Sequence, residues 1–327
     1  MISLLSFILL EPDTYLYIMW GVLALLTVIV AIVCWRSRRR WLRLLLLLPL
    51  LFAWYAFLWG TYVGFGQLEV VRLELSFKDL PKAFDGYKIV QFGDAHVGTY
   101  IGGRRDILRR AIDSINAQHA DAVVFTGDLQ NKEPSEIEKM EPLLSRIKAK
   151  DGIFTVLGNH DYTLYTDLEN PIEIGRNQGQ TEGFQMDMGW TLLMNEWRII
   201  RRDSSRIVIA GMENDGEGRF PQLGNINSAL YGLTRNDFVI MLEHDPTSWS
   251  RRILPHSHVQ LTLSGHTHGG QFSLFGLTPA MFKYRHYQGL YQTGQRRLYV
   301  TKGLGGVVPY RFGVTPEIVV ITLRSEQ

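Results

Sequence analysis

The sequence predicts a mixed α/β domain that follows two membrane-spanning helices. Three observations lead to this fold class. Two long apolar runs lie near the start of the chain, short apolar strands then alternate with amphipathic helical stretches, and polar side chains follow several of those strands directly. We therefore divide the chain into a membrane anchor, residues 1–62, and a folded domain, residues 63–327.

The anchor contains two apolar runs separated by a basic loop. Tyr15–Trp35 is 21 residues long and carries no charge, which is enough for a helix to cross about 30 Å of hydrocarbon. Leu44–Gly60 is 17 residues long, and Pro49 interrupts it, which a membrane helix tolerates when neighbours satisfy the freed carbonyl. Aromatic residues gather near the ends of both runs, as is typical of membrane interfaces. Met1–Leu10 is apolar but too short to span.

The loop between the two runs predicts how the chain is oriented. Five arginines and no acid lie between Arg36 and Arg43, and positive charge in short loops marks the cytoplasmic side. Both chain ends, and the folded domain with them, are then expected on the extracytoplasmic side. A cleaved signal peptide is the alternative interpretation, but its basic cluster would precede the apolar run, whereas here the cluster follows it.

Composition limits what the folded domain can bind. The formal net charge is +2, so that without the five loop arginines the remainder sums to −3 and provides no sequence-independent attraction to nucleic acid. Cys34 is the only cysteine and lies in the first apolar run, which excludes an intrachain disulfide and thiolate ligands for a metal. Any metal must therefore be bound by histidine, aspartate, asparagine or glutamate.

The first half of the folded domain alternates strands and helices. The predicted strands are Leu68–Phe77, Tyr87–Phe92, Ala122–Phe125 and Gly152–Leu157. Arg104–Gln118 has apolar residues at helical spacing, and Pro134 opens a second helix that runs to about Lys148. This order is the pattern of a sheet wrapped by helices. The next segment, Tyr162–Gly189, is polar and weakly patterned, so we expect a loop or insertion near the site.

The second half is richer in strands. Those predicted are Thr191–Met194, Trp197–Ile200, Arg206–Met212, Phe238–Leu242, Val259–Leu263, Arg297–Thr301 and Ile318–Leu323. Phe272–Tyr291 contains many aromatic and aliphatic side chains, and two interpretations stay open: they belong to the core, or they bind an apolar part of the substrate. Gly303–Gly306 lacks the lysine and the spacing of a P-loop and is expected to form a turn near the rim of the sheet.

Side chains that can bind metal appear where the apolar strands stop. They are Asp94, His96, Asp128, Asn159, His160, His244, His266 and His268. Taken singly, each has an ordinary structural interpretation, such as a helix N-cap for Asp94 or a core position for His244. Together they indicate a metal cluster, because the carboxyl ends of strands line the crevice where ligands bind. His256 and His258 are expected to lie in a loop outside that cluster.

In order along the chain, these motifs resemble the five sequence blocks of the calcineurin-like metallophosphoesterase superfamily. The blocks are Gly93-Asp94-Ala95-His96-Val97-Gly98, Gly127-Asp128, Gly158-Asn159-His160-Asp161, His244 and Gly265-His266-Thr267-His268. The resemblance covers nearly the whole folded domain. Residues 265–271 and 302–306 are similar to its membrane-associated bacterial branch, which includes UDP-2,3-diacylglucosamine hydrolases. One departure is that Gly93 stands where a serine often precedes the first aspartate.

The resemblance implies a fold and a set of roles. The fold would be a four-layer α/β/β/α sandwich, with two mixed sheets stacked face to face and helices outside. The implied ligands are Asp94, His96 and His268 for one metal ion, Asn159, His244 and His266 for the other, and Asp128 as the bridge between them. His160 would contact the phosphate oxygens or the leaving group, with Asp161 orienting its ring. The cofactors would be two divalent metal ions, and Mn, Zn and Fe stay open as their identity.

Such a metal pair activates water and stabilises charge on a phosphoryl group, so the chain is expected to hydrolyse a phosphodiester, a pyrophosphate or a phosphomonoester. Three functions stay open: hydrolysis of a membrane lipid phosphoester, broad extracytoplasmic hydrolysis of soluble esters, and a catalytically idle metal-binding scaffold. The expected location is the bacterial cell (inner) membrane. A nucleotide-linked lipid precursor belongs on the cytoplasmic side, which conflicts with the predicted orientation. The sequence predicts no oligomeric state.

Overall fold

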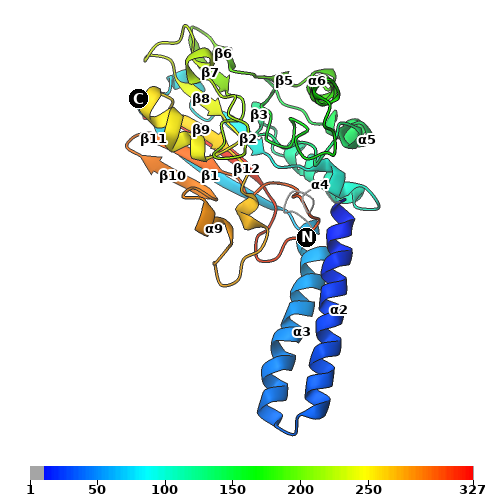
Figure 1. The fold of residues 1–327 in the computed structure, drawn as a ribbon. Helices are drawn as coiled ribbons and strands as arrows, with labels where there is room; N and C mark the ends of the chain where they lie inside the picture. Colours follow the sequence, from blue (N-terminus) through cyan, green and yellow to red (C-terminus); the bar gives the residue numbers. More distant parts are fainter. Residues whose placement is uncertain (1–10, 327) are drawn as a thin grey trace.

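The computed structural model describes residues 11–326 and shows two parts (Figure 1). Two long helices, α2 (Pro12–Arg36) and α3 (Arg40–Tyr62), project side by side from one end of an α/β domain. Both are long and apolar enough to cross a membrane, and most of their residues are not buried by the rest of the chain. The helices extend past both predicted spans. The apolar segment Met1–Leu10 lies outside the described residues.

The two helices are joined to each other and to the domain. Trp54 Nε1 of α3 donates a hydrogen bond to Thr27 Oγ1 of α2 at 2.9 Å, a type of contact that stabilises helix pairs in an apolar medium. At the domain end, Asp13 of α2 forms an ion pair with Arg104 at 2.7 Å. The last turns of α3 pack against residues 310–312 of the domain. The helix pair is therefore attached to the domain through both α2 and α3.

Two six-stranded sheets form the centre of the domain. The first has the order β1 (Glu69–Phe77), β12 (Glu317–Ser325), β2 (Lys88–Phe92), β3 (Ala122–Phe125), β4 (Ile153–Thr155), β5 (Thr191–Leu192). The second has the order β10 (Gly289–Thr293), β11 (Arg296–Val300), β9 (Leu261–Ser264), β8 (Val239–Leu242), β7 (Ser205–Gly211), β6 (Glu196–Arg202). Most neighbours are parallel; β12 with β2, β10 with β11, and β6 with β7 are antiparallel. The parallel strands bring their carboxyl ends to one edge.

Three hydrophobic clusters separate four layers. One lies between the two sheets and includes Ile89 and Ile240. A second packs the outer face of the first sheet against α4 (Arg105–Asn116) and α5 (Ser135–Leu144). The third covers the outer face of the second sheet and includes Trp249. The four-layer α/β/β/α sandwich implied by the family resemblance is confirmed (Figure 1).

The segment Tyr162–Gly189 is not the predicted loop, because most of it forms helix α6 (Pro171–Asp187). Asn170 caps the N-terminus of the helix by accepting a backbone hydrogen bond. On the buried side, Thr181 and Gln185 form side-chain hydrogen bonds to the domain at 2.8 and 2.7 Å. Phe184 also packs against the core, but the fully buried positions of the helix are these two polar residues, which explains why the sequence lacks apolar periodicity there.

For the segment Phe272–Tyr291, the structure contradicts the interpretation that all of its apolar side chains belong to the core. The segment contains a short helix, α9 (Ala280–Lys283), and the start of β10, an edge strand that the sequence analysis missed because it is mostly exposed and does not alternate. Phe275 and Phe282 are exposed, so the aromatic residues of this segment do not all belong to the core.

Candidate metal centre

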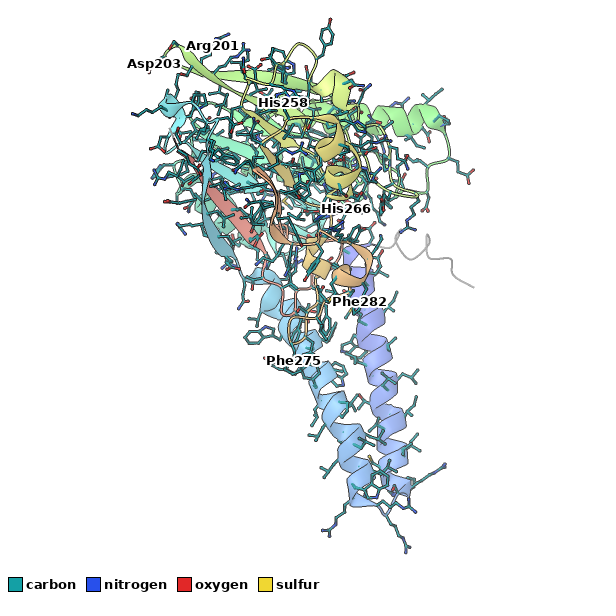
Figure 2. The ribbon with its side chains drawn as sticks, turned by 90° about the vertical axis from the view of Figure 1, so that its left-hand side faces the viewer. Arg201, Asp203, His258, His266, Phe275 and Phe282 are labelled. Atoms are coloured by element: carbon teal, nitrogen blue, oxygen red, sulfur yellow. The ribbon has the colours of Figure 1, made fainter. Side chains whose placement is uncertain are left out.

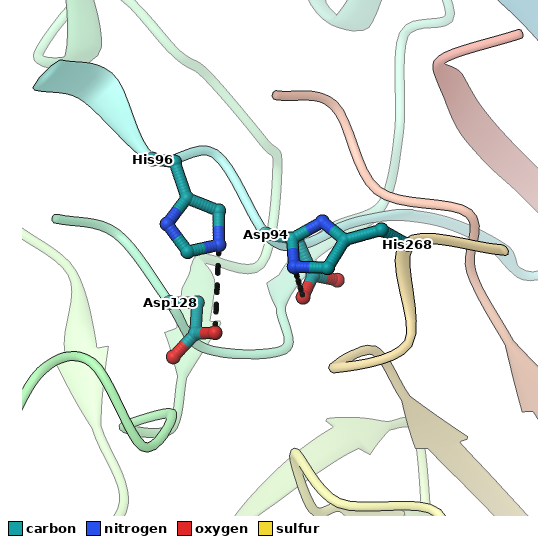
Figure 3. A group of neighbouring side chains, drawn as sticks. All are labelled: Asp94, His96, Asp128 and His268. Carbon is teal, nitrogen blue, oxygen red and sulfur yellow. Dashed lines mark ion pairs between the residues drawn. The ribbon is translucent and has the colours of Figure 1, made fainter. Parts of the chain in front are cut away.

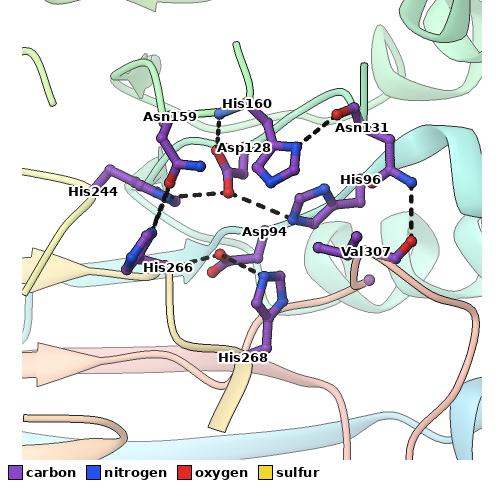
Figure 4. Close-up of polar contacts among 12 residues, drawn as sticks. Asp94, His96, Asp128, Asn131, Asn159, His160, His244, His266, His268 and Val307 are labelled. Carbon is purple, nitrogen blue, oxygen red and sulfur yellow. Dashed lines mark hydrogen bonds and ion pairs between the residues drawn. The ribbon is translucent and has the colours of Figure 1, made fainter. Parts of the chain in front are cut away.

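The polar side chains predicted from the sequence meet at one edge of the stacked sheets. Asp94 and His96 follow β2, Asp128 follows β3, Asn159 and His160 follow β4, His244 follows β8, and His266 and His268 follow β9. All eight side chains are buried. Figure 4 shows them directed toward a common centre, although they come from five separate loops.

One group of possible ligands contains Asp94, His96, Asp128 and His268 (Figure 3). One ligand atom from each lies within 4.8 Å of the others. His96 Nε2 is 3.5 Å from Asp128 Oδ2, and His268 Nε2 is 3.7 Å from Asp94 Oδ1. Carboxylate oxygens and imidazole nitrogens at this spacing can surround one divalent cation.

A second group shares Asp128 with the first and adds His244 and His266. His244 Nε2 is 3.2 Å from Asp128 Oδ2. The amide oxygen of Asn159 joins them, at 3.2 Å from His244 Nε2 and 2.7 Å from His266 Nδ1. The structure therefore brings the seven sequence-predicted ligands into two adjacent groups with one common carboxylate.

Several polar atoms in the first group have no hydrogen-bond partner among the described residues. They are Asp94 Oδ2, both ring nitrogens of His96 and Nδ1 of His268. An unpaired buried polar group costs about 1–3 kcal/mol, so such atoms gathered in one place indicate a partner from outside the chain. A divalent cation bound by nitrogen and oxygen ligands fits this donor set.

The charges around the centre also favour a cation. Burial lowers the pKa of His96 to about 3 and that of His266 to about 4, so both imidazoles are neutral and keep a lone pair for a metal. Burial raises the pKa of Asp94 to about 7. Burial also disfavours the charge of Asp128, but His244, whose own pKa this carboxylate raises to about 10 against the effect of burial, outweighs it and holds the Asp128 pKa well below its ordinary value. The Asp128 carboxylate thus retains its negative charge at the shared position.

The backbone around these residues is strained. Asp94, His96, Asp128, His266 and His268 have φ between 43° and 74°, a left-handed region that residues other than glycine rarely adopt. Strain of this kind persists where the surrounding structure enforces it, which is common at functional sites. The chain also approaches the carboxylates closely, because a side chain at Gly158 would collide with Asp128 and one at Gly265 with Asp94.

His160 lies beside the two groups, but its ring is held differently from the prediction. Its Nδ1 is 2.6 Å from the carbonyl oxygen of Asn131, and its ring stacks on Tyr165 at 4.1 Å. The predicted orientation of this ring by Asp161 is wrong. The Asp161 carboxylate instead accepts hydrogen bonds from four backbone N–H groups after β3 and β4, at 2.9 to 3.3 Å. Both carboxylate oxygens of Asp161 are directed to these N–H groups and not to the His160 ring. Asp161 therefore stabilises the loops after β3 and β4.

A pocket of about 180 Å³ opens onto the polar centre. Its lining includes Asp128, Asn159, His160, Tyr165, Arg219, Phe220, His266, His268, Tyr284 and Val307. Tyr284 Oη lies 3.0 Å from His266 Nε2, and the exposed Lys283 Nζ lies 4.9 Å from the Phe220 ring. Arg219, Phe220 and Tyr165 could not be recognised from the sequence, because they stand in loops without the residue types that identify a metal ligand.

Two other candidates lie elsewhere. A wider hollow of about 770 Å³ surrounds His119 and Lys148 at the amino end of β3, the opposite edge of the sheet from Asp128. His258 lies well away from His266 in Figure 2, in agreement with the prediction that it does not belong to the metal cluster.

Comparisons with known proteins agree on one family. The family model "Calcineurin-like phosphoesterase" matches residues 87–270. The chain is 32% identical to the uncharacterized metallophosphoesterase YkuE of Bacillus subtilis, over 82% of this chain and 89% of that protein. It is 32% identical to a Danio rerio transmembrane protein with metallophosphoesterase domain, over 79% of this chain and 57% of that protein. It is 27% identical to the phosphodiesterase YaeI of Escherichia coli, over 79% of this chain and 89% of that protein.

Proposed function

Because the chain belongs to the calcineurin-like phosphoesterase family, it is a metal-dependent phosphoester hydrolase, and we propose that it is anchored in a membrane and acts on a phosphoester of a membrane lipid. The observation that carries the chemistry is the position of Asp128, which belongs to both groups of possible ligands and lies in the lining of the open pocket.

We assign the two metal positions from the contacts around Asp128. The first position has Asp94, His96 and His268 as its other ligands, and the second has Asn159, His244 and His266. When bound, two divalent cations supply a water of lowered pKa and neutralise charge on the phosphoryl oxygens. Asp128 would be a ligand to both cations, and its negative charge would offset their mutual repulsion.

His160 is assigned to the substrate and not to a metal. Its Nδ1 is engaged by the Asn131 carbonyl, so Nε2 is the ring atom available to the pocket. Burial lowers the pKa of His160, so the free imidazole is neutral. A bound phosphate anion would favour the protonated ring, which could then donate a proton to the leaving oxygen.

The mouth of the pocket supports an anionic substrate close to a membrane. Arg219 lines the pocket, and Lys283 lies over the rings of Phe220 and Tyr284, so positive charge borders the entrance. Tyr284 comes two residues after Phe282, which Figure 2 shows at the height where the helix pair meets the domain. An enzyme held beside a bilayer gains most from a substrate that also resides there.

The proposed orientation places this domain on the extracytoplasmic side. The five loop arginines stand where α2 ends and α3 begins, which is the end of the helix pair farthest from the domain (Figure 1). If that end faces the cytoplasm, as its positive charge predicts, the domain faces the other side. This arrangement disfavours a nucleotide-linked lipid precursor from the cytoplasm as the substrate.

A chelation experiment tests the metal assignment. The full chain, reconstituted in lipid nanodiscs, would be stripped with a chelator and supplied with Mn²⁺ or Zn²⁺, with a soluble nitrophenyl phosphodiester as substrate. We expect turnover to disappear and to return with the metal. Turnover that persists after thorough chelation would remove the two-metal assignment.

The lipid assignment needs a second comparison. A phosphodiester attached to a diacylglycerol in the same nanodisc would be compared with a soluble ester that has the same headgroup. We expect kcat/KM to favour the lipid-borne ester at least tenfold. Equal values would favour the main alternative, a broad hydrolase of soluble esters. The phosphodiesterase name of the Escherichia coli relative is the reason to begin with diesters.

A further inference from the structure

An exposed apolar loop stands beside the helix pair. This loop, residues 272–284, follows the candidate ligand His268 and ends at Tyr284 in the pocket lining. The exposed fraction is 96% for Phe275, 83% for Phe282 and 58% for Leu277. Figure 2 shows Phe275 alongside α3 and Phe282 at the level where the helices meet the domain. Large apolar side chains gathered at such exposure mark an interaction surface.

The tip of the loop is built to hold an aromatic side chain outward. Phe275 and Gly276 both have positive φ, 53° and 81°, as in the tight turn that joins antiparallel strands. Asparagine or aspartate would adopt this conformation more easily than phenylalanine. Phe275 is therefore both exposed and in an unfavourable conformation. A contact that its side chain makes outside the domain best explains this combination.

The backbone on either side of the tip is hydrogen-bonded within the protein. Leu274 and Leu277 exchange two backbone hydrogen bonds, each 3.0 Å long, and the N–H of Ser273 donates to the carbonyl of Phe312 at 2.7 Å. Irregular backbone enters an apolar medium only when its polar groups are paired within the protein. The residues that flank the tip, 273, 274 and 277, therefore meet this requirement for contact with lipid.

The base of the loop lies well below the domain end of α3. Phe272 stacks on Phe312 with ring centroids 5.7 Å apart, and Phe312 packs edge-on against Phe52 and Tyr55 of α3 at 5.9 and 6.0 Å. Phe52 precedes Tyr62, the last residue of α3, by ten residues, which corresponds to about 15 Å along a helix. Phe52 is also near the middle of the apolar run of α3. A bilayer that covers this run would therefore cover the base of the loop.

We propose that the loop of residues 272–284 inserts its apolar tip into the bilayer beside α3, as a third point of membrane contact. The occupant of this surface is lipid, because the surface continues the apolar surface of a helix that is itself long enough to span. The inference requires that α2 and α3 cross a membrane. The loop also joins the lipid surface to the entrance of the metal site, because Phe282 lies two residues from Tyr284 of the pocket lining. This link to the substrate rests on the proposed function.

Spin labels on the reconstituted full chain test the insertion without reference to activity. Cys34 would be replaced (Cys34→Ser), and single labels placed through Phe275→Cys and Phe282→Cys. Phe275 and Phe282 are exposed, so the fold is expected to persist when they are replaced. Leu48→Cys, on the exposed surface of α3, is the lipid control. Ser204→Cys is the water control, in the turn between the labelled Arg201 and β7 at the end of the domain farthest from the helices (Figure 2).

We expect the labels at 275 and 282 to resemble the one at 48, with high accessibility to oxygen and low accessibility to a water-soluble nickel chelate. Accessibility equal to that of the label at 204 would overturn the proposal. Dipolar broadening between labels, lost when each nanodisc holds one chain, would overturn it in favour of contact between two copies.

Activity is measured separately. The double variant Phe275→Ser, Phe282→Ser should lower turnover of the lipid-borne ester about tenfold and leave turnover of the soluble ester unchanged. If the loop inserts but this selective loss is absent, the link between the loop and the substrate is wrong and the insertion itself stands.

Discussion

Arg311 Nη1 donates a hydrogen bond to the backbone carbonyl of His268 at 2.7 Å. The backbone N–H of the same arginine donates to the carbonyl of Gly60 in α3 at 2.9 Å, so one residue links helix α3 to a candidate metal ligand. The Arg311 side chain is 1% exposed, and burial lowers its pKa to about 10, which still leaves it charged at neutral pH. Its guanidinium is held by backbone carbonyls, among them that of Gly305 at 3.1 Å.

Arg311→Met should weaken metal binding at the position that includes His268. The change removes the donor that holds the His268 backbone, and losing such a supporting contact typically costs about 10–100-fold in metal affinity. Metal titration against a chelator of known affinity would measure it. Arg311→Lys should restore part of the affinity, and Arg324→Met, at an exposed arginine, should have no effect. Unchanged affinity in Arg311→Met would contradict the link.

Asp128→Asn should be the most damaging single ligand change. Asp128 belongs to both groups of ligands, whereas Asp94 belongs to one. We therefore expect Asp128→Asn to lose metal from both positions and Asp94→Asn to lose it mainly from one. Elemental analysis of the two purified variants after identical metal loading makes the comparison. Equal metal contents would show that Asp128 is not the shared ligand.

His160→Ala should slow catalysis and leave metal binding nearly intact. The ring is held by Asn131 and Tyr165 beside the metal groups, and loss of a general acid typically reduces the rate by about 10²–10⁴. Turnover and metal content would be measured on the same preparation. If the variant lost about one metal per chain, His160 would have to be counted among the ligands.

Asp161→Asn should lower stability more than His160→Ala does. The carboxylate of Asp161 accepts four backbone hydrogen bonds, and an amide would turn a donor toward some of those N–H groups. We expect a loss of about 2–4 kcal/mol in the free energy of unfolding, since one or two buried groups would be left unpaired. Thermal unfolding of the metal-free variants would measure this difference. A wild-type midpoint in Asp161→Asn would argue against the structural role.

A reporter that is active only outside the cytoplasm, fused after Gln327, should be active. The prediction rests on the arginine-rich loop between α2 and α3. Replacing Arg36, Arg38, Arg39, Arg40 and Arg43 by neutral residues should weaken the orientation. Activity of a cytoplasmic reporter at the same position would reverse the topology and bring back the nucleotide-linked lipid as a substrate.

The sequence by itself determined the features that depend on short stretches of chain. The two apolar runs could be recognised because spanning a membrane requires length and composition only. Asp94, Asp128 and His244 could be recognised because each directly follows a buried strand, and parallel strands necessarily end at a common edge. Their grouping therefore needed only the strand pattern and the family resemblance, and no knowledge of individual contacts.

Only the tertiary structure decided the features that depend on contacts between distant segments. Asp161 follows His160 in sequence, yet three of its four partners are backbone groups after β3, which no local pattern indicates. Helix α6 was missed because hydrogen bonds of Thr181 and Gln185 hold it to the domain, and these leave no apolar period. The exposure of Phe275 beside α3 likewise follows from how residues far apart in the chain pack, and a side chain's burial is a property of that packing and not of its own chemistry.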